Sequence, residues 1–479
     1  MKLRTFAYPA NGTAQPTRPP RVSPWPRRWQ NIGPSPDRKV LEFIDANNKW
    51  VRLQAVDGAT STAPEDRAYW ASVQLVYDQL DGLVAGYNAH RGGLNALTPT
   101  QIQLIGMTVE LGDIGQAVEP SRRPRFERMS AAELDEWRFA HSHCSAMIKT
   151  TADLGELFSS HNTWTGYEDM LRLWKVYAFP FSTAVATTVS FSGYPGKIAG
   201  IDDFYVTSER LTVIETTNGV YNTSLFDAVT PQTVPYWARV TVANRNAASA
   251  PAWHQIFYRY NSGTYNNQWM TVDYKLFTPH QPLRPNTLVV SEQLPGYFTV
   301  ADQTMALQRG HWPSYNVPFY SDIYERSGYV DIVRRFGPTS SYQLAHRAPI
   351  FRRDADTVGD LDSMRHFMRL NRYNISGLGP GGHGFDPLFA TPSSAIAARG
   401  DLAPGPALRM GGATDCKITS AAMIGKLQAT AVAGPTSVAT GDLQPIFSWT
   451  GRFADLGQFR HYGHPTYFNF SWQVFGPMP

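Results

Sequence analysis

The sequence has few cysteines, little excess charge and no long apolar run. Two cysteines in 479 residues cannot form a disulfide framework. A formal net charge of +4 is nearly balanced for this length, so we expect no nucleic-acid partner. No stretch approaches the roughly 20 consecutive apolar residues that cross a bilayer, so we expect no transmembrane segment. The first residues turn polar at once and lack the apolar core of a signal peptide.

What is abundant points to a large globular protein. Aromatic residues make up 13% of the chain, and there are 38 glycines and 35 prolines. This mix favours strands and long ordered loops over a helical bundle. The length suits one large domain or two ordinary ones.

Residues 1–45 differ from the rest because prolines and arginines recur along them. Such a segment is predicted to be extended, with little core of its own. Three interpretations remain open: an arm wrapped along its own domain, a disordered tail, or a docking segment for a protein partner with an acidic surface.

The remaining chain mixes helical and strand-like patterns, which predicts an α+β fold or a sandwiched sheet. Helices are predicted over residues 64–90, 98–117, 165–176, 364–370 and 420–427, and one is predicted after Ser130. Strands are predicted over residues 146–149, 157–161, 187–191, 204–207, 211–216, 237–242 and 269–276.

Cys144 is the most informative residue. It follows His143, and a second histidine, His161, lies shortly downstream. A lone thiol near a histidine is a candidate nucleophile. The alternative is a small buried hydrophobic side chain, the commoner role of a free cysteine.

A series of blocks in the same region resembles the phospholipase B-like family, which includes lamina-ancestor-type proteins and belongs to the N-terminal nucleophile hydrolases. The resemblance runs in family order from about residue 64 to the C-terminus. The blocks are His143–Ala146, His161–Trp164, Asp202–Tyr205, Glu215–Asn222, Asn261–Gln268, Trp312–Asn316, Arg347–Arg353, Asp362–Met364, Ala398–Leu402 and Gly411–Asp415. Together these blocks are far more specific than any one of them.

The resemblance implies a four-layer αββα sandwich, in which two antiparallel sheets lie between helices. It also implies self-cleavage between His143 and Cys144. Residues 46–143 would then form a helical N-terminal fragment and residues 144–479 the catalytic fragment, folded together as one compact unit. An N-terminal cysteine carries both a thiol that attacks and an α-amine, with a pKa of about 8, that can move a proton.

The resemblance also assigns roles to four other residues. It implies that His161 orients the thiol or polarises water, that Trp164 forms a pocket wall, that Asn316 donates to an oxyanion, and that Arg347 favours the thiolate. The alternatives are a core histidine, plain packing, a turn residue and a structural salt bridge, respectively.

Three asparagines in the same blocks, Asn218, Asn266 and Asn267, are further candidates for the pocket, although glycine-flanked asparagines also serve turns. No spacing of Cys, His and Asp predicts a metal site, and no glycine-rich loop predicts a nucleotide, so we expect no cofactor. Familiar members of the family are secreted or lysosomal, whereas this sequence has few cysteines and no export signal. We therefore expect an intracellular or particle-packaged protein.

These observations predict a self-processing cysteine hydrolase of acyl esters or amides, which acts on phospholipids or on lipid-like amides. The alternative is a structural or binding protein that retains the fold and docks to a larger assembly through residues 1–45.

Overall fold

A computed structural model describes residues 4–7, 35–92, 95–141, 144–179, 181, 184–373, 391–450 and 460–477. Most of the proline-rich segment lies outside these residues. Within it, Arg4–Ala7 form an edge strand. A helix begins at Arg38, where the Asp37 side chain accepts a hydrogen bond from the Val40 amide at 3.0 Å. The sequence analysis placed residues 38–45 in the extended arm, and this boundary was wrong because Asp37 starts the helix immediately after the last proline of the segment.

One layer is an antiparallel sheet of eight strands. In spatial order these are β1 (Arg4–Ala7), β5 (Leu173–Ala178), β6 (Thr188–Gly193), β7 (Phe204–Thr207), β8 (Leu211–Thr217), β9 (Asn267–Asp273), β10 (Leu288–Leu294) and β11 (Tyr297–Asp302). Successive side chains of β8 serve different cores, with Val213 facing the helices and Ile214 facing the second sheet.

The second layer is an antiparallel sheet of six strands, accompanied by a small two-stranded ribbon. In spatial order the six are β12 (His311–Ser314), β2 (Ser145–Thr150), β3 (Leu157–Asn162), β14 (Asp415–Ser420), β15 (Ala429–Ala433) and β16 (Gln473–Phe475). The ribbon pairs β13 (Gly411–Ala413) with β4 (Trp164–Gly166). The apolar core between the two sheets includes Ile148 from the second and Val206 from the first.

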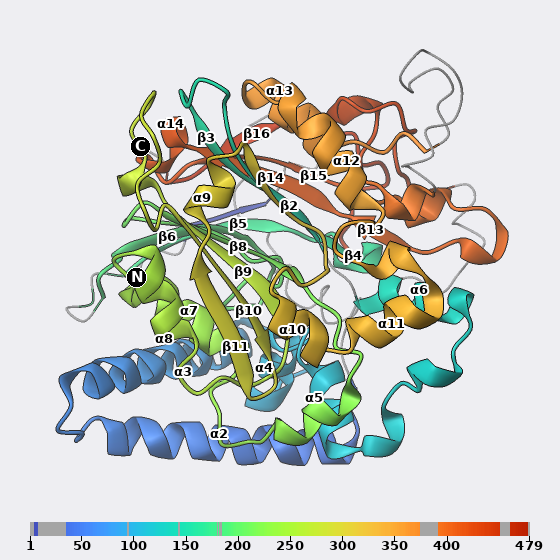
Figure 1. Ribbon diagram of the computed structural model, residues 1–479. Helices are drawn as coiled ribbons and strands as arrows, with labels where there is room; N and C mark the ends of the chain where they lie inside the picture. The colour runs from blue at the N-terminus through green and yellow to red at the C-terminus, as the bar shows by residue number, and fades with distance from the viewer. Residues whose placement is uncertain are drawn as a thin grey trace, which may run out of the picture.

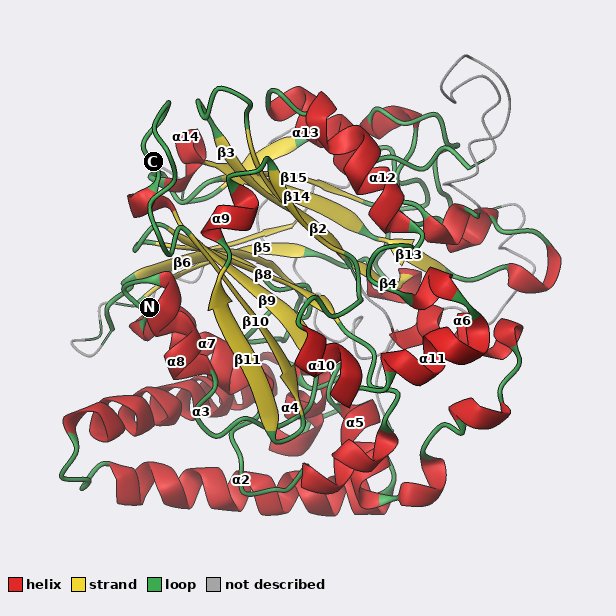
Figure 2. Ribbon diagram, viewed as in Figure 1, coloured by secondary structure: helices red, strands yellow, loops and turns green. Residues whose placement is uncertain are grey.

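Helices cover both outer faces and complete the four layers (Figures 1 and 2). Under the eight-stranded sheet lie α2 (Arg38–Gly58), α3 (Pro64–His90), α4 (Pro99–Gly106), α5 (Leu111–Val118), α7 (Tyr236–Asn246) and α8 (Ala250–Phe257). On the side of the six-stranded sheet lie α6 (Ala131–His141), α11 (Tyr329–Phe336), α12 (Arg347–Asp354) and α13 (Leu361–Met368). Three short helices contact sheet strands: α9 (Thr304–Leu307), α10 (Ser321–Arg326) and α14 (Ala421–Ile424). The predicted αββα sandwich is confirmed.

Local signals explain several helix boundaries. The helix predicted over residues 64–90 is α3, with Pro64 in its first turn. At the start of α6, the Glu133 carboxylate accepts from the Ser130 amide at 2.7 Å, and the Ser130 hydroxyl accepts from the Glu133 amide at 3.3 Å. This is the predicted capping box.

Two element predictions were wrong. Residues 237–242 were predicted as a strand but lie in α7, where Arg239 is buried and donates to Val234 O, Phe257 O and Ser262 Oγ. The alternation of polar and apolar residues suggested a strand with one solvent-exposed face. Arg239 instead points into the protein, so the alternation did not report exposure. Residues 165–176 were predicted as a helix but contain the end of β4, a single 3₁₀ turn at Tyr167–Asp169 and the start of β5. The β5 part is a strand because it pairs with strands on both sides.

The helix predicted over residues 98–117 is interrupted, forming α4 and α5. Between them, Glu110 is buried and accepts from the Tyr236 amide at 3.0 Å and from the Thr264 hydroxyl at 2.7 Å. These tertiary hydrogen bonds hold the turn in place. In the described part of the chain, no helix combines the length and apolar character that a bilayer span requires.

Candidate active site

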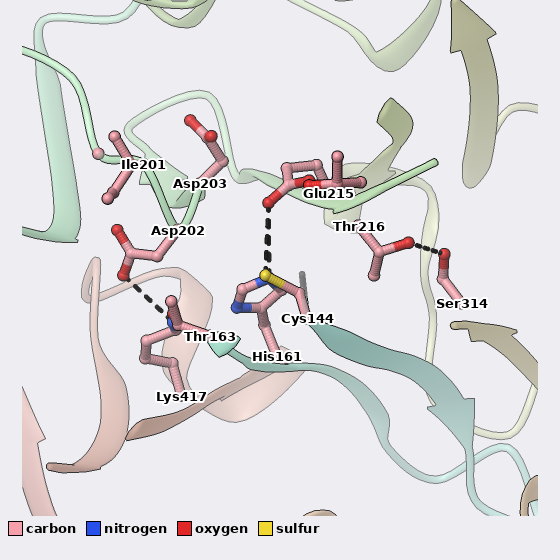
Figure 3. Close-up of polar contacts among 12 residues, drawn as sticks. Cys144, His161, Thr163, Ile201, Asp202, Asp203, Glu215, Thr216, Ser314 and Lys417 are labelled. Carbon is pink, nitrogen blue, oxygen red and sulfur yellow. Dashed lines mark hydrogen bonds and ion pairs between the residues drawn. The ribbon is translucent and has the colours of Figure 1, made fainter. Parts of the chain in front are cut away.

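Cys144 lies immediately before β2, at one end of the space between the sheets, and its side chain is fully buried. Its backbone φ is 84°, in the left-handed region that a residue with a Cβ rarely occupies. Its thiol donates to the Glu215 carboxyl on β8, with Sγ and Oε1 3.7 Å apart (Figure 3). The other half of the predicted cleavage site, His143, lies outside the described residues.

His161 reaches the same place from β3, because the register of the sheet pairs it with Ala146. Its Nε2 lies 3.9 Å from Glu215 Oε1. In the described part of the chain, neither ring nitrogen has a hydrogen-bond partner. The structure therefore brings Cys144, His161 and Glu215 together in one buried cluster.

Burial favours the neutral form of all three groups. It raises the pKa of the Cys144 thiol well above its ordinary value, and the nearby Glu215 carboxylate raises it further. Burial also raises the pKa of Glu215. It lowers the pKa of His161, and the positive charge of Lys417 adds to that effect. The cluster therefore holds a thiol rather than a thiolate.

Among the described residues, the same three side chains could also hold a metal ion. The Cys144 sulfur, a ring nitrogen of His161 and a carboxylate oxygen of Glu215 all lie within 4.8 Å of one another. Thiolate, imidazole and carboxylate are ligands that Zn²⁺ accepts. The sequence analysis expected no metal site, because residues 144, 161 and 215 show none of the short spacings that mark one.

Arg347, the first residue of α12, holds the backbone at Cys144. Its guanidinium donates to Cys144 O at 2.6 Å and to Ser145 Oγ at 2.8 Å, and it lies over the Trp164 ring, 4.2 Å from its centroid. Burial lowers the pKa of Arg347 to about 9. The predicted role was to stabilise the thiolate. In the structure, these hydrogen bonds hold the Cys144 carbonyl and the Ser145 hydroxyl, while the guanidinium packs on the Trp164 ring.

Asn316 follows β12 and also has a positive φ, of 70°. Its Nδ2 donates to Thr217 O at 2.6 Å, and its Oδ1 accepts from Arg347. The side chain thus links Arg347 to the end of β8. The predicted oxyanion donor is adjacent to the site, and one of its N–H groups is used in this link.

The three asparagines predicted for the pocket divide into two groups. Asn218 and Asn266 line a pocket of about 230 Å³ between α5, the end of α6 and the segment after β8. Asn267, in β9, does not line this pocket and is fully buried. Among the described residues, neither its side-chain nitrogen nor its side-chain oxygen has a hydrogen-bond partner.

A buried charge network lies beside the cluster. The Lys417 ammonium lies 3.2 Å from the Asp202 carboxylate (Figure 3). It also lies 2.9 Å from the Asp415 carboxylate, and Arg172 contacts both carboxylates. Although burial opposes its ionisation, Arg172 and Lys417 lower the pKa of Asp202. Asp203 points to different partners, Tyr205 and Tyr236, and burial raises its pKa.

The sequence analysis did not single out Glu215 and Tyr265, which the structure places in and beside the cluster. Glu215 opens one of the blocks quoted for the family resemblance, and it is an acidic residue in an otherwise apolar and threonine-rich strand. The Tyr265 hydroxyl donates to Glu215 Oε1 at 3.0 Å. The acidic Glu215 within a strand of otherwise apolar and threonine residues was the feature of the sequence that could have identified it as a site residue.

Comparison with known proteins shows the family of the chain. A family model described as Phospholipase B matches residues 28–475. The chain belongs to the phospholipase B family. The family predicted from the sequence is thus confirmed, and membership supports hydrolase chemistry.

Relatives within the phospholipase B family match most of the chain. It is 39% identical over 422 residues to phospholipase B-like protein D of Dictyostelium discoideum, covering 85% of this chain and 71% of that protein. It is 35% identical over 452 residues to phospholipase B-like 1 of Rattus norvegicus, covering 93% and 76%. A mutant conjugated bile acid hydrolase from Clostridium perfringens aligns over 60% of this chain and 89% of its own at TM-score 0.36 and 11% identity, a likeness too remote for further inference.

Proposed function

We propose that this chain is a self-processing hydrolase whose nucleophile is Cys144. The Cys144 sulfur attacks the carbonyl carbon of His143, the peptide C–N bond breaks, and the thiol proton passes to the departing nitrogen. Water then hydrolyses the thioester, which leaves a carboxylate on His143 and restores the thiol. Cys144 becomes the first residue of the larger fragment and gains a free α-amine.

The observation that carries this proposal is the conformation and setting of Cys144. A positive φ at a residue with a Cβ costs about 1–3 kcal/mol and is found where surrounding contacts impose it. Here Arg347 binds the Cys144 carbonyl and Glu215 accepts from the thiol. Cleavage before Cys144 would release this backbone constraint and expose the nucleophile.

The processed enzyme would use the same sulfur on an acyl ester or amide. The thiol attacks the acyl carbonyl while the α-amine accepts its proton and passes it to the leaving alcohol or amine. Water then releases the acid from the acyl thioester. Family membership favours a lipid-like acyl substrate, either a phospholipid or an amide. Glu215 and His161 are the adjacent groups that would position the amine and the water.

We expect the purified protein to separate into two polypeptides under denaturing conditions, because the peptide bond before Cys144 would be broken. N-terminal sequencing of the larger polypeptide should begin Cys-Ser-Ala-Met. Intact mass measurement should assign the remaining mass to the fragment that ends at His143. A single polypeptide of 53.4 kDa in active material would contradict the proposal.

The rate of processing should rise with pH. Burial raises the pKa of both Cys144 and Glu215. The attacking thiolate is therefore a minor form at neutral pH. Both the thiolate and the Glu215 carboxylate, which can take the thiol proton, become more populated as pH increases.

Precursor made by cell-free synthesis can be diluted into buffers from about pH 6 to pH 8 and sampled with time on denaturing gels. We expect the rate to rise by up to about tenfold per pH unit. A rate that falls across this range would mean that a protonated group drives the reaction and would exclude this account of the nucleophile.

A further inference from the structure

Three side-chain amide oxygens in the pocket next to the cluster accept no hydrogen bond from the described residues. Gln116, Asn218 and Asn266 all line it, and their side chains are at most 9% exposed. In the described part of the chain, the side-chain oxygen of each has no hydrogen-bond partner. Buried polar atoms are usually paired, so three unpaired acceptors in one pocket indicate a bound donor.

The amide orientations of the two asparagines are set by their neighbours. Asn266 Nδ2 donates to Gly263 O at 2.9 Å, and Asn218 Nδ2 donates to the Glu292 carboxylate at 3.4 Å. Because both of these partners are oxygens that accept, the asparagine nitrogens point to them and the Oδ1 atoms are left for a ligand.

Asp113 and His141 add two more acceptors. Asp113 Oδ2 accepts from the Tyr265 amide at 2.8 Å, and burial raises the pKa of Asp113 to about 7. His141 Nδ1 lies 2.8 Å from Trp137 O, which can only accept, so Nδ1 carries the proton and Nε2 is an acceptor.

No lysine or arginine lines this pocket among the described residues. A phosphate placed here would meet a carboxyl group and amide oxygens and would have no cation to neutralise it. A primary ammonium has three N–H donors and a positive charge, which match several acceptor oxygens and one carboxylate.

The pocket adjoins the nucleophile through one shared carboxyl group. Thr217 and Tyr265 line the pocket, and both donate to Glu215, at 3.5 Å and 3.0 Å. Glu215 also accepts from the Cys144 thiol. A group held in the pocket is therefore separated from the nucleophile by the Glu215 side chain.

We propose that this pocket binds a primary ammonium group carried by the substrate, so that the enzyme selects acyl compounds with an amine-bearing polar part over those with an anionic one. This inference rests on the proposed function, because it takes the compound bound there to be the substrate. The amine belongs either to an ethanolamine-type lipid head group or to the free α-amine of a peptide-like compound.

Isothermal titration of the full-length Cys144→Ala protein tests the pocket independently of hydrolysis. Ethanolamine represents the lipid head group, glycinamide represents the peptide-like amine, and inorganic phosphate represents an anion. We expect saturable binding of at least one amine and none of phosphate. Whichever amine binds more tightly identifies the source of the ammonium group.

Variants assign the binding to the pocket. Asp113→Asn should weaken amine binding about tenfold or more by removing the carboxylate, whereas Gln116→Glu should strengthen it by adding one. Asp227→Asn is the matched control, because Asp227 is exposed, pairs with Arg123 and does not line the pocket.

Phosphate binding more tightly than both amines, amine binding that is unchanged by Asp113→Asn and Gln116→Glu, or an absence of amine binding would overturn the inference. Wild-type protein that is cleaved before Cys144 and hydrolyses acyl compounds, but whose alanine variant binds no amine, would refute this inference alone. Amine binding that depends on Asp113, in a protein that never cleaves or hydrolyses, would refute the proposed function alone.

Discussion

Replacing Cys144 by alanine is expected to leave a single uncleaved polypeptide and to reduce acyl hydrolysis by about 10³-fold or more. The variant has no sulfur to attack the His143 carbonyl and forms no acyl thioester, and loss of a covalent nucleophile typically removes most of the rate enhancement. Denaturing electrophoresis measures the first effect, and turnover of an acyl ester and an acyl amide measures the second.

Cys416→Ala is the matched control for this experiment. Cys416, in β14, is also a fully buried free thiol, and burial raises its pKa to about 12. It packs in the core on the helical side of the six-stranded sheet, away from the Glu215 cluster. Its variant should cleave and hydrolyse like the wild type. If Cys144→Ala kept wild-type turnover, Cys144 would not be the nucleophile.

The second large effect is on stability. Lys417→Met should lower the free energy of unfolding by about 3–5 kcal/mol. Among the described residues, it leaves the buried Asp202 and Asp415 carboxylates with Arg172 as the one cation still paired to them. Methionine preserves the length of the side chain, so the loss is mainly electrostatic. Denaturant titration followed by tryptophan fluorescence measures it.

The sign of the pH dependence distinguishes this cause from a packing defect. Removing Lys417 removes one of the charges that hold the pKa of Asp202 low. The unpaired carboxylate then favours protonation, so the penalty should be smaller at acidic pH than at neutral pH. Adding Asp202→Asn to Lys417→Met should recover part of the loss. Lys39→Met is the control, because Lys39 pairs with Glu119 at the surface and should cost about 1 kcal/mol or less.

Local patterns accounted for much of the secondary structure. The capping box at Ser130 predicted α6, and the acidic first turn after Pro64 predicted α3. These signals act over a few residues, so they can be read without knowing the fold. The pattern failed at Arg239, because an inward-facing arginine satisfied by carbonyls resembles the polar face of a strand.

The candidate site was predictable only in part. Cys144 directly precedes β2 and His161 lies in β3, the next strand of the same hairpin, so their proximity follows from the register of β2 and β3. Arg347 and Asn316 were suggested by the family resemblance, and the structure links them by a hydrogen bond. Arg347 contacts the Cys144 carbonyl, and Asn316 contacts Thr217 O. Residue types alone do not predict either contact.

The sequence by itself determined the family, the single thiol with a nearby histidine and most of the elements, because caps, periodicity and motif blocks are written in adjacent residues. The tertiary structure alone decided that Glu215, 71 residues from Cys144, accepts from its thiol, and that Lys417, 215 residues from Asp202, balances that carboxylate. Such contacts depend on how two sheets stack and on which strands lie opposite, and neither is encoded in a local pattern.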